Sequence, residues 1–260
     1  MRLLFIGDIV GASGRRFLTD RLPDLHRHFQ YDVCLANAEN AAAGKGLTSN
    51  LAHKLHDAGI DIMTLGNHAF ARQELLSTID SLPYVVRPAN VPEAWPGRDH
   101  AIVQTPAGTV IVTSLLGRVF MDPVNDPFGP SIPFCENLMT RYQSRLLIVD
   151  FHAEATSEKM AFAHFMDGHC TLAVGTHTHV QTADERILPG GTATITDVGM
   201  TGPADGVIGM ETRSSLRRFV DHLPSPYEVS EGPSQLNAIF VEADPASGRA
   251  THIERIRIIE

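Results

Sequence analysis

The sequence predicts an α/β fold with two sheets packed together and helices outside them, and three observations support this class. Near-continuous apolar runs alternate with helical patterns, which is typical of a largely parallel core. Two turn-linked pairs of short strands, together with alternating strands at the C-terminal end, indicate antiparallel pairing as well. No internal repeat or domain boundary is evident. We therefore expect the 260 residues to form a single domain, residues 1–260.

The predicted parallel strands are short runs rich in Val, Ile and Leu, as strands buried on both faces are. We expect them at residues 3–6, 33–36, 60–65, 146–149 and 171–174. Helical patterns lie between several of them, at residues 13–29, 48–58, 71–80 and 156–167. Thr48 is placed to cap its helix, and Gly59 lies where a helix C-terminus favours glycine.

The antiparallel parts come later in the chain. We expect one hairpin around Pro106-Ala107-Gly108 and another around Pro189-Gly190-Gly191. Residues 238–242 and 252–259 alternate between polar and apolar side chains, as half-buried antiparallel strands do. The Pro-rich stretch 121–133 predicts an ordered surface loop.

The charge balance excludes one class of partner. The formal net charge is −9 and no run of Lys or Arg is present, whereas proteins that hold long nucleic acid need a basic face. Apolar residues make up 43% and charged residues 20%, as in ordinary soluble proteins. A small charged substrate remains compatible with this charge if bound metal cations reverse the local field.

The cysteines and the N-terminal segment predict the compartment. Cys34, Cys135 and Cys170 are scattered and form no CxxC pair, which favours a reducing compartment over a disulfide frame or a thiolate metal site. The apolar run near the N-terminus is too short for a signal peptide or a membrane span. We therefore expect a cytoplasmic protein without a membrane partner.

Candidate metal ligands directly follow five of the predicted strands. In chain order they are Asp8, the pair Glu39 and Asn40, Asn67 beside His68, His152, and the pair His177 and His179. The carboxyl ends of parallel strands meet at one edge of an open sheet, so we expect all five groups to converge there. His177 and His179 are two residues apart, so on an extended segment their side chains would point the same way.

The chemistry of these side chains predicts a metal centre. Imidazole nitrogens combined with carboxylate and amide oxygens suit Mn, Fe or Zn and fit Ca or Mg poorly. The candidates are too many for one tetrahedral ion. Two ions about 3.5–4 Å apart that share a carboxylate would use them economically.

Each group alone also has a plainer interpretation. Asp8 could cap a helix that starts near Ser13, and Asn67 with His68 could cap the helix that follows them. Glu39 and Asn40 could form a solvated turn, and a lone histidine is more often structural than a ligand. Five coincidences at five strand ends are a poor explanation, so we favour the joint site.

The motifs resemble a known superfamily. Gly7-Asp8, Gly66-Asn67-His68, a later lone His152 and Gly175-Thr176-His177-Thr178-His179 are similar, in this order, to the marks of the calcineurin-like metallophosphoesterases. Longer strings resemble the YmdB branch of that superfamily over nearly the whole chain. They are residues 6–11, 37–42, 150–159 and 194–203. Two departures from the general pattern, the loss of the histidine in DxH and a Glu at position 39 in place of the bridging Asp, match this branch.

The resemblance implies a ligand set, a fold and an activity. It implies a first metal held by Asp8, Glu39, Asn40 and His179, and a second held by Glu39, Asn67, His152 and His177. Adjacent strand residues point in opposite directions, so Glu39 and Asn40 can converge only if the chain turns there. The resemblance further implies a four-layer α/β/β/α sandwich of two mixed sheets, two iron or manganese ions, and a homo-oligomer, either a dimer or a tetramer. The implied reaction is hydrolysis of phosphodiesters such as 2′,3′-cyclic AMP.

For such a reaction the metals would lower the pKa of a bound water enough to supply hydroxide. His68 is the best candidate for the general acid, although it could instead only orient a neighbour. Residues that could support the ligands are Asp150, Glu154, Thr176 and Asp197. Glu154 could alternatively pair with Lys159 across a turn.

Two other functions are compatible with the same motifs. A phosphomonoesterase or 5′-nucleotidase would use the same dimetal core on a different ester. A regulatory protein could bind metals and a nucleotide without turnover.

Overall fold

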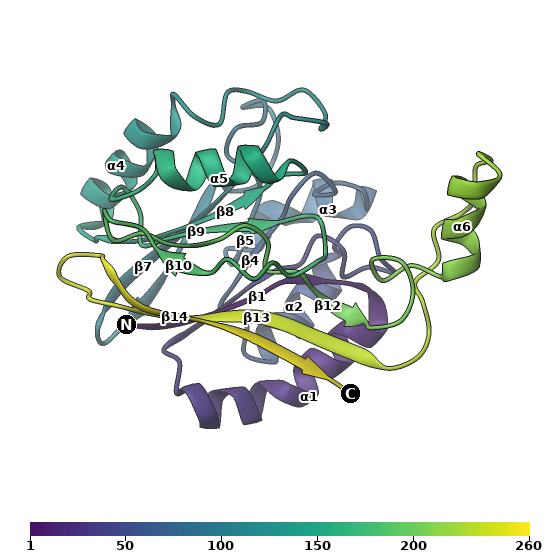
Figure 1. Cartoon of the computed structure of the whole chain (residues 1–260). Coiled ribbons are helices and arrows are strands. Elements are labelled where there is room, and N and C mark those ends of the chain that lie inside the picture. The colour runs from purple at the N-terminus through teal and green to yellow at the C-terminus, as the bar shows by residue number, and fades with distance from the viewer.

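Residues 1–260, all of which the computed structural model describes, form two mixed β-sheets that pack face to face, with helices on both outer sides (Figure 1). The first sheet has the order β2-β12-β13-β1-β3-β4-β5, with β14 beside β13. Its strands are β1 (Arg2–Ile6), β2 (Asp8–Ile9), β3 (Val33–Asn37), β4 (Ile62–Thr64), β5 (Val85–Val86), β12 (Met200–Pro203), β13 (Ser234–Ala243) and β14 (Ala250–Ile259).

The second sheet has the order β10-β11-β9-β8-β7-β6. Its strands are β6 (His100–Thr105), β7 (Gly108–Leu116), β8 (Leu146–His152), β9 (Leu172–Thr176), β10 (Arg186–Ile187) and β11 (Ala193–Ile195). The helices are α1 (Gly11–Phe29), α2 (Ser49–Asp57), α3 (Gln73–Thr78), the 3₁₀ turn η1 (Ile79–Ser81), α4 (Ser131–Tyr142), α5 (Thr156–Phe165) and α6 (Thr212–Val220).

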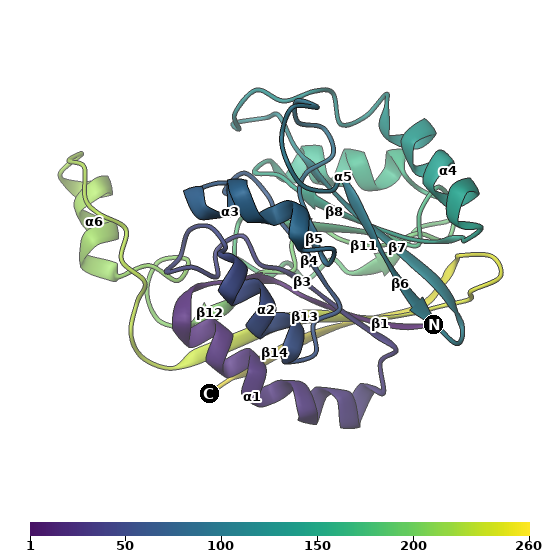
Figure 2. The ribbon, with the colours of Figure 1, turned by 180° about the vertical axis from the view of Figure 1, so that it is seen from behind.

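Alternation along the central strands creates three apolar layers between four layers of structure. In β1, Leu4 and Ile6 face the helices α1 to α3, while Leu3 and Phe5 face the second sheet. The outer face of the second sheet packs against α4 and α5, where Phe162 is fully buried. Figure 2 shows α1 and α2 on one side of the sheets and α4 and α5 on the other. The predicted α/β/β/α sandwich is confirmed.

Parallel pairing brings the carboxyl ends of the important strands together. Strands β1, β3, β4 and β5 run parallel in the first sheet, as do β7, β8, β9 and β11 in the second. The two sheets contact each other at these ends, where Asn37 Nδ2 donates to Asp150 Oδ2 at 3.0 Å and Ser114 Oγ donates to the carbonyl oxygen of Leu65 at 2.8 Å. A single rim therefore contains the ends of strands from both sheets.

Most predicted elements are present, with shifted ends. Both hairpins form, β13 pairs antiparallel with β14, and Thr48 caps α2 by accepting from the Leu51 amide. Gly59 adopts a left-handed φ of 109°, as expected after a helix. The predicted loop 121–133 is wrong at its end, because α4 begins at Ser131. Pro133 lies in the first turn of α4, where a missing N–H breaks no helical hydrogen bond.

Two further observations concern the helices. Neither α4 nor α6 is predicted by the sequence patterns above, and α6 stands clear of the sandwich in both views (Figures 1 and 2). None of the helices combines the length and the apolar character that crossing a membrane would require.

The packing of α5 against the outer face of the second sheet can be tested by mutation of Phe162. The rings of Phe151 and Phe162 stack with centroids 4.0 Å apart, and Phe162 has no exposed surface. Replacing Phe162 by Ala should lower the free energy of unfolding by about 3–5 kcal/mol, because it opens a cavity that the sheet cannot close. Phe165→Ala is the control on the same helix, since this ring is 38% exposed, and it should cost about 1 kcal/mol or less. Urea denaturation of both variants measures the difference, and equal losses would contradict this packing.

Candidate metal centre

The structure brings all seven predicted ligands to the shared rim. Asp8 follows β1 and starts β2, the pair Glu39 and Asn40 follows β3, and Asn67 follows β4. His152 is the last residue of β8, and the two histidines of the His177 motif follow β9. The chain turns at residues 39–40, as convergence of these two neighbours requires. Whether the seven side chains hold metal ions stays a prediction.

One group of these side chains surrounds the amide of Asn40. Its Nδ2 lies 3.4 Å from Asp8 Oδ1, 3.3 Å from Glu39 Oε1 and 3.2 Å from His179 Nε2. Asn40 Oδ1 lies on the other side, 2.9 Å from His68 Nδ1. The NH₂ group therefore occupies the point at which three potential metal-ligating atoms meet.

A second group surrounds the ring of His152. Its Nε2 lies 3.1 Å from Glu39 Oε1, 2.9 Å from Asn67 Oδ1 and 3.0 Å from His177 Nδ1. The potential ligand atoms of Glu39, His152 and His177 all lie within 4.8 Å of one another. Glu39 Oε1 contacts both groups, so this carboxylate lies between them.

The two histidines of the final motif do not lie on an extended segment, so that prediction is wrong. Strand β9 ends at Thr176, and both His177 and His179 adopt positive φ angles, 103° and 67°. Their rings consequently separate, one to each group. Thr176, before them, is buried and its Oγ1 donates to Asp150, while Thr178, between them, is half-buried and its Oγ1 donates to Asp197.

The plainer interpretations of Asp8 and Asn67 are also wrong. The N-cap of α1 is Val10, which makes no side-chain capping bond, and Asp8 instead accepts from the backbone amide of His177 at 3.3 Å. The helix after Asn67 begins only at Gln73. Neither polar residue is therefore explained as a helix cap.

His68 lies at the edge of both groups and partly in solvent. Its backbone amide donates to Glu39 Oε2 at 2.9 Å, and its side chain is 28% exposed. The ring is oriented through Nδ1, next to Asn40 Oδ1, while Nε2 makes no hydrogen bond to the protein. A ring held on one nitrogen and free on the other is suited to exchange a proton with a bound molecule.

A buried network of hydrogen bonds orients the ring of His152 through its Nδ1. Its Nδ1 lies 2.8 Å from Thr176 Oγ1, which donates to Asp150 Oδ1 at 2.6 Å. Asp150 Oδ2 accepts from Asn37 Nδ2 and from Thr64 Oγ1. Asp150 and Thr176 are among the predicted supporting residues, whereas Asn37 and Thr64 are not. The signal that could have identified these two is a polar residue near the end of an otherwise apolar strand.

The predicted alternative pairing of Glu154 with Lys159 is wrong. Glu154 Oε2 lies 3.1 Å from His177 Nε2, on the outer side of the second group. Lys159 extends inward from α5 and forms a buried ion pair with Asp197 at 2.6 Å. Asp197 also accepts from the backbone amide and hydroxyl of Thr178, so it fixes the loop that contains both histidines.

Burial tends to raise the pKa values of Asp8 and Glu39, whereas nearby imidazoles tend to lower them. Burial raises the pKa of Asp8 to about 6, although His179 and His152 partly oppose the rise. Burial would also raise the pKa of Glu39, but the contacts with His152 and His68 hold it well below its ordinary value. Glu39 therefore stays ionised because imidazoles surround it.

The pKa values of the two histidines of the second group, His152 and His177, are shifted in opposite directions. Burial would lower the pKa of His152, but the adjacent Glu39 charge overcomes it and raises that pKa to about 9. Burial and the charge on His152 lower the pKa of His177 to about 3. A proton on His152 thus supplies positive charge next to Glu39.

These observations fit a site for cations. Asp8 and Glu39 are both buried, and neither contacts a Lys or Arg. Buried carboxylates are costly unless a positive charge or several hydrogen bonds compensate them. The donor set combines carboxylate oxygens, amide oxygens and imidazole nitrogens, which suits Mn, Fe and Zn. The residues present are therefore compatible with metal ions in both groups.

A cavity of about 690 Å³ opens over this cluster, within the range of small-ligand pockets. It is lined by Glu39, Asn40, His68, His177, His179, Lys45, Arg72, Ile208, Met210 and Tyr227, among others.

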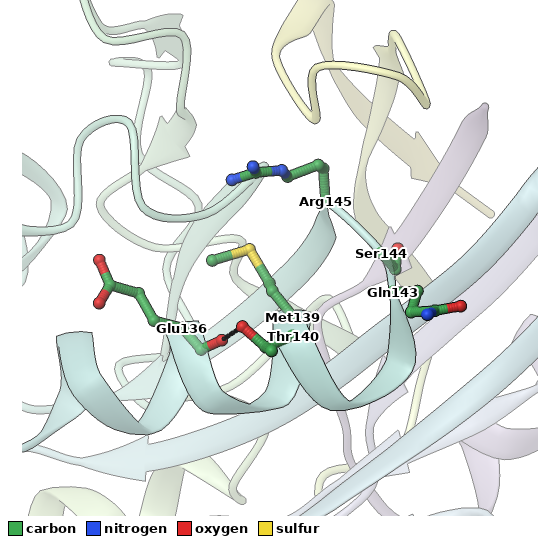
Figure 3. A pocket seen from close by; sticks show the side chains of 6 residues that line it. All are labelled: Glu136, Met139, Thr140, Gln143, Ser144 and Arg145. Atoms are coloured by element: carbon green, nitrogen blue, oxygen red, sulfur yellow. Dashed lines mark hydrogen bonds between the residues drawn. The ribbon is translucent and has the colours of Figure 1, made fainter.

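Figure 3 shows a different hollow, of about 420 Å³, beside the C-terminal end of α4. It adjoins the residue before β8, at the opposite end of that strand from His152, and it contains no candidate ligand.

The chain is similar to known proteins over nearly its whole length. Residues 4–256 match the family described as YmdB-like protein. A 2′,3′-cyclic-nucleotide 2′-phosphodiesterase of Bacillus subtilis is 44% identical over 258 residues, which cover 99% of this chain and 97% of that protein.

Two solved structures are similar over 100% of this chain. A hypothetical protein from Thermus thermophilus has a TM-score of 0.91 at 38% identity and is fully covered. A novel phosphatase from Mycoplasma pneumoniae has a TM-score of 0.92 at 36% identity, with 94% of that chain covered. The predicted resemblance is confirmed, and this chain belongs to the YmdB-like protein family.

Proposed function

We propose that this chain is a metal-dependent phosphodiesterase that hydrolyses cyclic nucleotides such as 2′,3′-cyclic AMP. Its family and its 44% identity to a bacterial 2′,3′-cyclic-nucleotide 2′-phosphodiesterase make it a phosphoric ester hydrolase. The metal dependence is proposed because of the position of Glu39, a buried carboxylate that contacts both groups of candidate ligands. A shared carboxylate between two such groups is what a dimetal hydrolase needs.

The proposed ligands follow from the two groups. Asp8, Glu39, Asn40 and His179 would hold one ion, and Glu39, Asn67, His152 and His177 would hold the other. We propose iron or manganese, with zinc as an alternative, because the donor set suits all three. Such ions supply Lewis acidity toward the phosphoryl oxygens and an activated water at neutral pH. The chain's own contribution is to orient these ligands through the buried network on His152 and to exclude bulk water from Asp8 and Glu39.

His68 is the proposed general acid. Its Nε2 makes no hydrogen bond to the protein, so it can donate a proton to the leaving alkoxide oxygen as the P–O bond breaks. The amide of Asn40 offers one acceptor end and one donor end. A ring that acts as general acid carries a proton on both nitrogens, so His68 would give up the proton on Nε2 and keep the one on Nδ1, where Asn40 Oδ1 can accept it.

Two other functions remain to be separated by experiment. A phosphomonoesterase or 5′-nucleotidase would use the same rim, and a regulator that binds metals and a nucleotide would use it without turnover. The proposed partner is a small phosphate ester. A homo-oligomer, as a dimer or tetramer, and a cytoplasmic location are also proposals.

Metal dependence is tested at Glu39. The purified chain should contain about two transition-metal ions by elemental analysis and hydrolyse 2′,3′-cyclic AMP and bis-p-nitrophenyl phosphate faster than p-nitrophenyl phosphate. Glu39→Gln should lose at least one ion and about 100-fold or more in turnover, because it removes the shared charge. Glu136→Gln, the same change at an exposed residue of α4, should alter neither the metal content nor the turnover.

The outcomes of this experiment separate the candidate functions. Full turnover after exhaustive chelation would exclude metal dependence. A preference for the monoester would favour the phosphomonoesterase. Bound metal without turnover on any ester would favour the regulator.

The role of His68 has a separate test. His68→Ala should keep its metal content but lose about 10²- to 10⁴-fold in turnover of 2′,3′-cyclic AMP, whose alkoxide leaves poorly without a proton. The loss should be much smaller with bis-p-nitrophenyl phosphate, because p-nitrophenolate needs no protonation to leave. His169→Ala, at a surface histidine, is the control. Equal losses on both substrates would reject the acid role and leave His68 as an orienting residue.

A further inference from the structure

Residues 211–228 leave the sandwich as an arm that contains α6 and then return to it (Figures 1 and 2). The two ends of this arm are tied together. Met210 and Val229 form an antiparallel bridge, and the Glu211 amide donates to the carbonyl oxygen of Glu228 at 2.8 Å. The arm therefore joins the body through a closed base.

The base of the arm is held against the loops of the metal site. Val229 packs with Val10, Met200 and Met210 in a small apolar cluster. A Cβ on Gly44, in the loop that follows Asn40, would lie 2.8 Å from Val229 Cγ2, so glycine is needed for this close approach. Val229, the first residue after the arm, is thus packed against the loop that follows Asn40.

Tyr227 lies two residues before Val229 and lines the cavity that also contains His68, His177 and His179. Its side chain is 62% exposed, so burial in the apolar cluster does not account for an aromatic ring at this position. The guanidinium of Arg218, from α6, lies 4.3 Å from the ring centroid and covers one face of the ring. The opposite face is not covered by Arg218.

Two apolar side chains border the cavity beside this ring. Ile208 is 47% exposed, and Met210 lies at the base of the arm. The same cavity is also lined by candidate ligands together with Lys45 and Arg72. The cavity therefore combines ionic groups that suit a phosphate with aromatic and apolar side chains that suit a flat, weakly polar group.

We propose that Tyr227 is the platform on which the substrate's nucleobase stacks, with Arg218 bracing the ring from behind. The proposal rests on the function proposed above and deepens it by naming the part of the site that selects nucleotides over other phosphodiesters. Base stacking on an aromatic side chain tolerates every base but is stronger for the larger purines. Tyr227 also borders a second hollow, beside Arg16 on α1, but none of the candidate metal ligands lines that hollow.

The test compares substrates that differ only in their base. Tyr227→Ala in the metal-loaded chain should raise KM for 2′,3′-cyclic AMP about tenfold while kcat changes less than twofold, because stacking contributes to binding rather than to the chemical step. The ratio of KM for 2′,3′-cyclic UMP to KM for 2′,3′-cyclic AMP should fall toward one. Tyr227→Phe should retain the wild-type values, since the ring and not the hydroxyl provides the platform.

Phe219→Ala is the matched control. This ring lies on the same arm and is 74% exposed, but it does not line the cavity, so its loss should leave both KM values unchanged. If Tyr227→Ala keeps the wild-type KM for both nucleotides, the platform is refuted while the phosphodiesterase stands. If the wild-type chain hydrolyses no cyclic nucleotide but does hydrolyse bis-p-nitrophenyl phosphate, the nucleotide assignment itself is wrong. Equal loss of kcat on every substrate would indicate a structural role and also refute the platform.

Discussion

Asp8 and Glu39 lie at the rim between the two sheets, both removed from solvent, and the positive charge that reaches them comes from imidazoles rather than from Lys or Arg. Two carboxylates in that position are unfavourable unless compensated. The neighbouring imidazoles and their hydrogen bonds compensate these two carboxylates. His152 carries the charge that holds Glu39 ionised, and a network ending in Asp150 fixes the ring of His152. Bound cations would satisfy the same requirement more completely, and this is the basis for proposing a metal centre here.

The sequence was sufficient to predict the strands, the rim and the residues that meet there, because strand periodicity and parallel topology determine which side chains emerge at one edge. It could not predict the backbone of the final histidine motif. The positive φ angles of His177 and His179 occur in a loop whose Thr178 amide donates to Asp197, and no local sequence pattern indicates this contact. Glu154 lies beside His177, as expected for a residue that supports a ligand, but its alternative pairing with Lys159 is wrong. Local spacing suggested a pair across a turn, whereas burial directs Lys159 inward.

The arm shows a second limit of sequence patterns. The N-caps of α4 and α6 are Pro130 and Glu211, so neither helix begins with the Ser, Thr, Asp or Asn cap that usually marks a helix start. The placement of Tyr227 beside the cavity is evident only in the folded chain. If the nucleobase stacks on Tyr227 as proposed, changes in the arm would alter substrate preference without touching the candidate ligands.

Each group of candidate ligands draws on both sheets. Asp8, Glu39, Asn40 and Asn67 lie at or after strand ends of the first sheet, and His152, His177 and His179 lie at or after strand ends of the second. Cations held there would act as non-covalent cross-links between the two halves of the sandwich. The rim would then have a mechanical part as well as a chemical one: it would oppose sliding of one sheet over the other, and ion occupancy would add to the free energy that keeps the halves together.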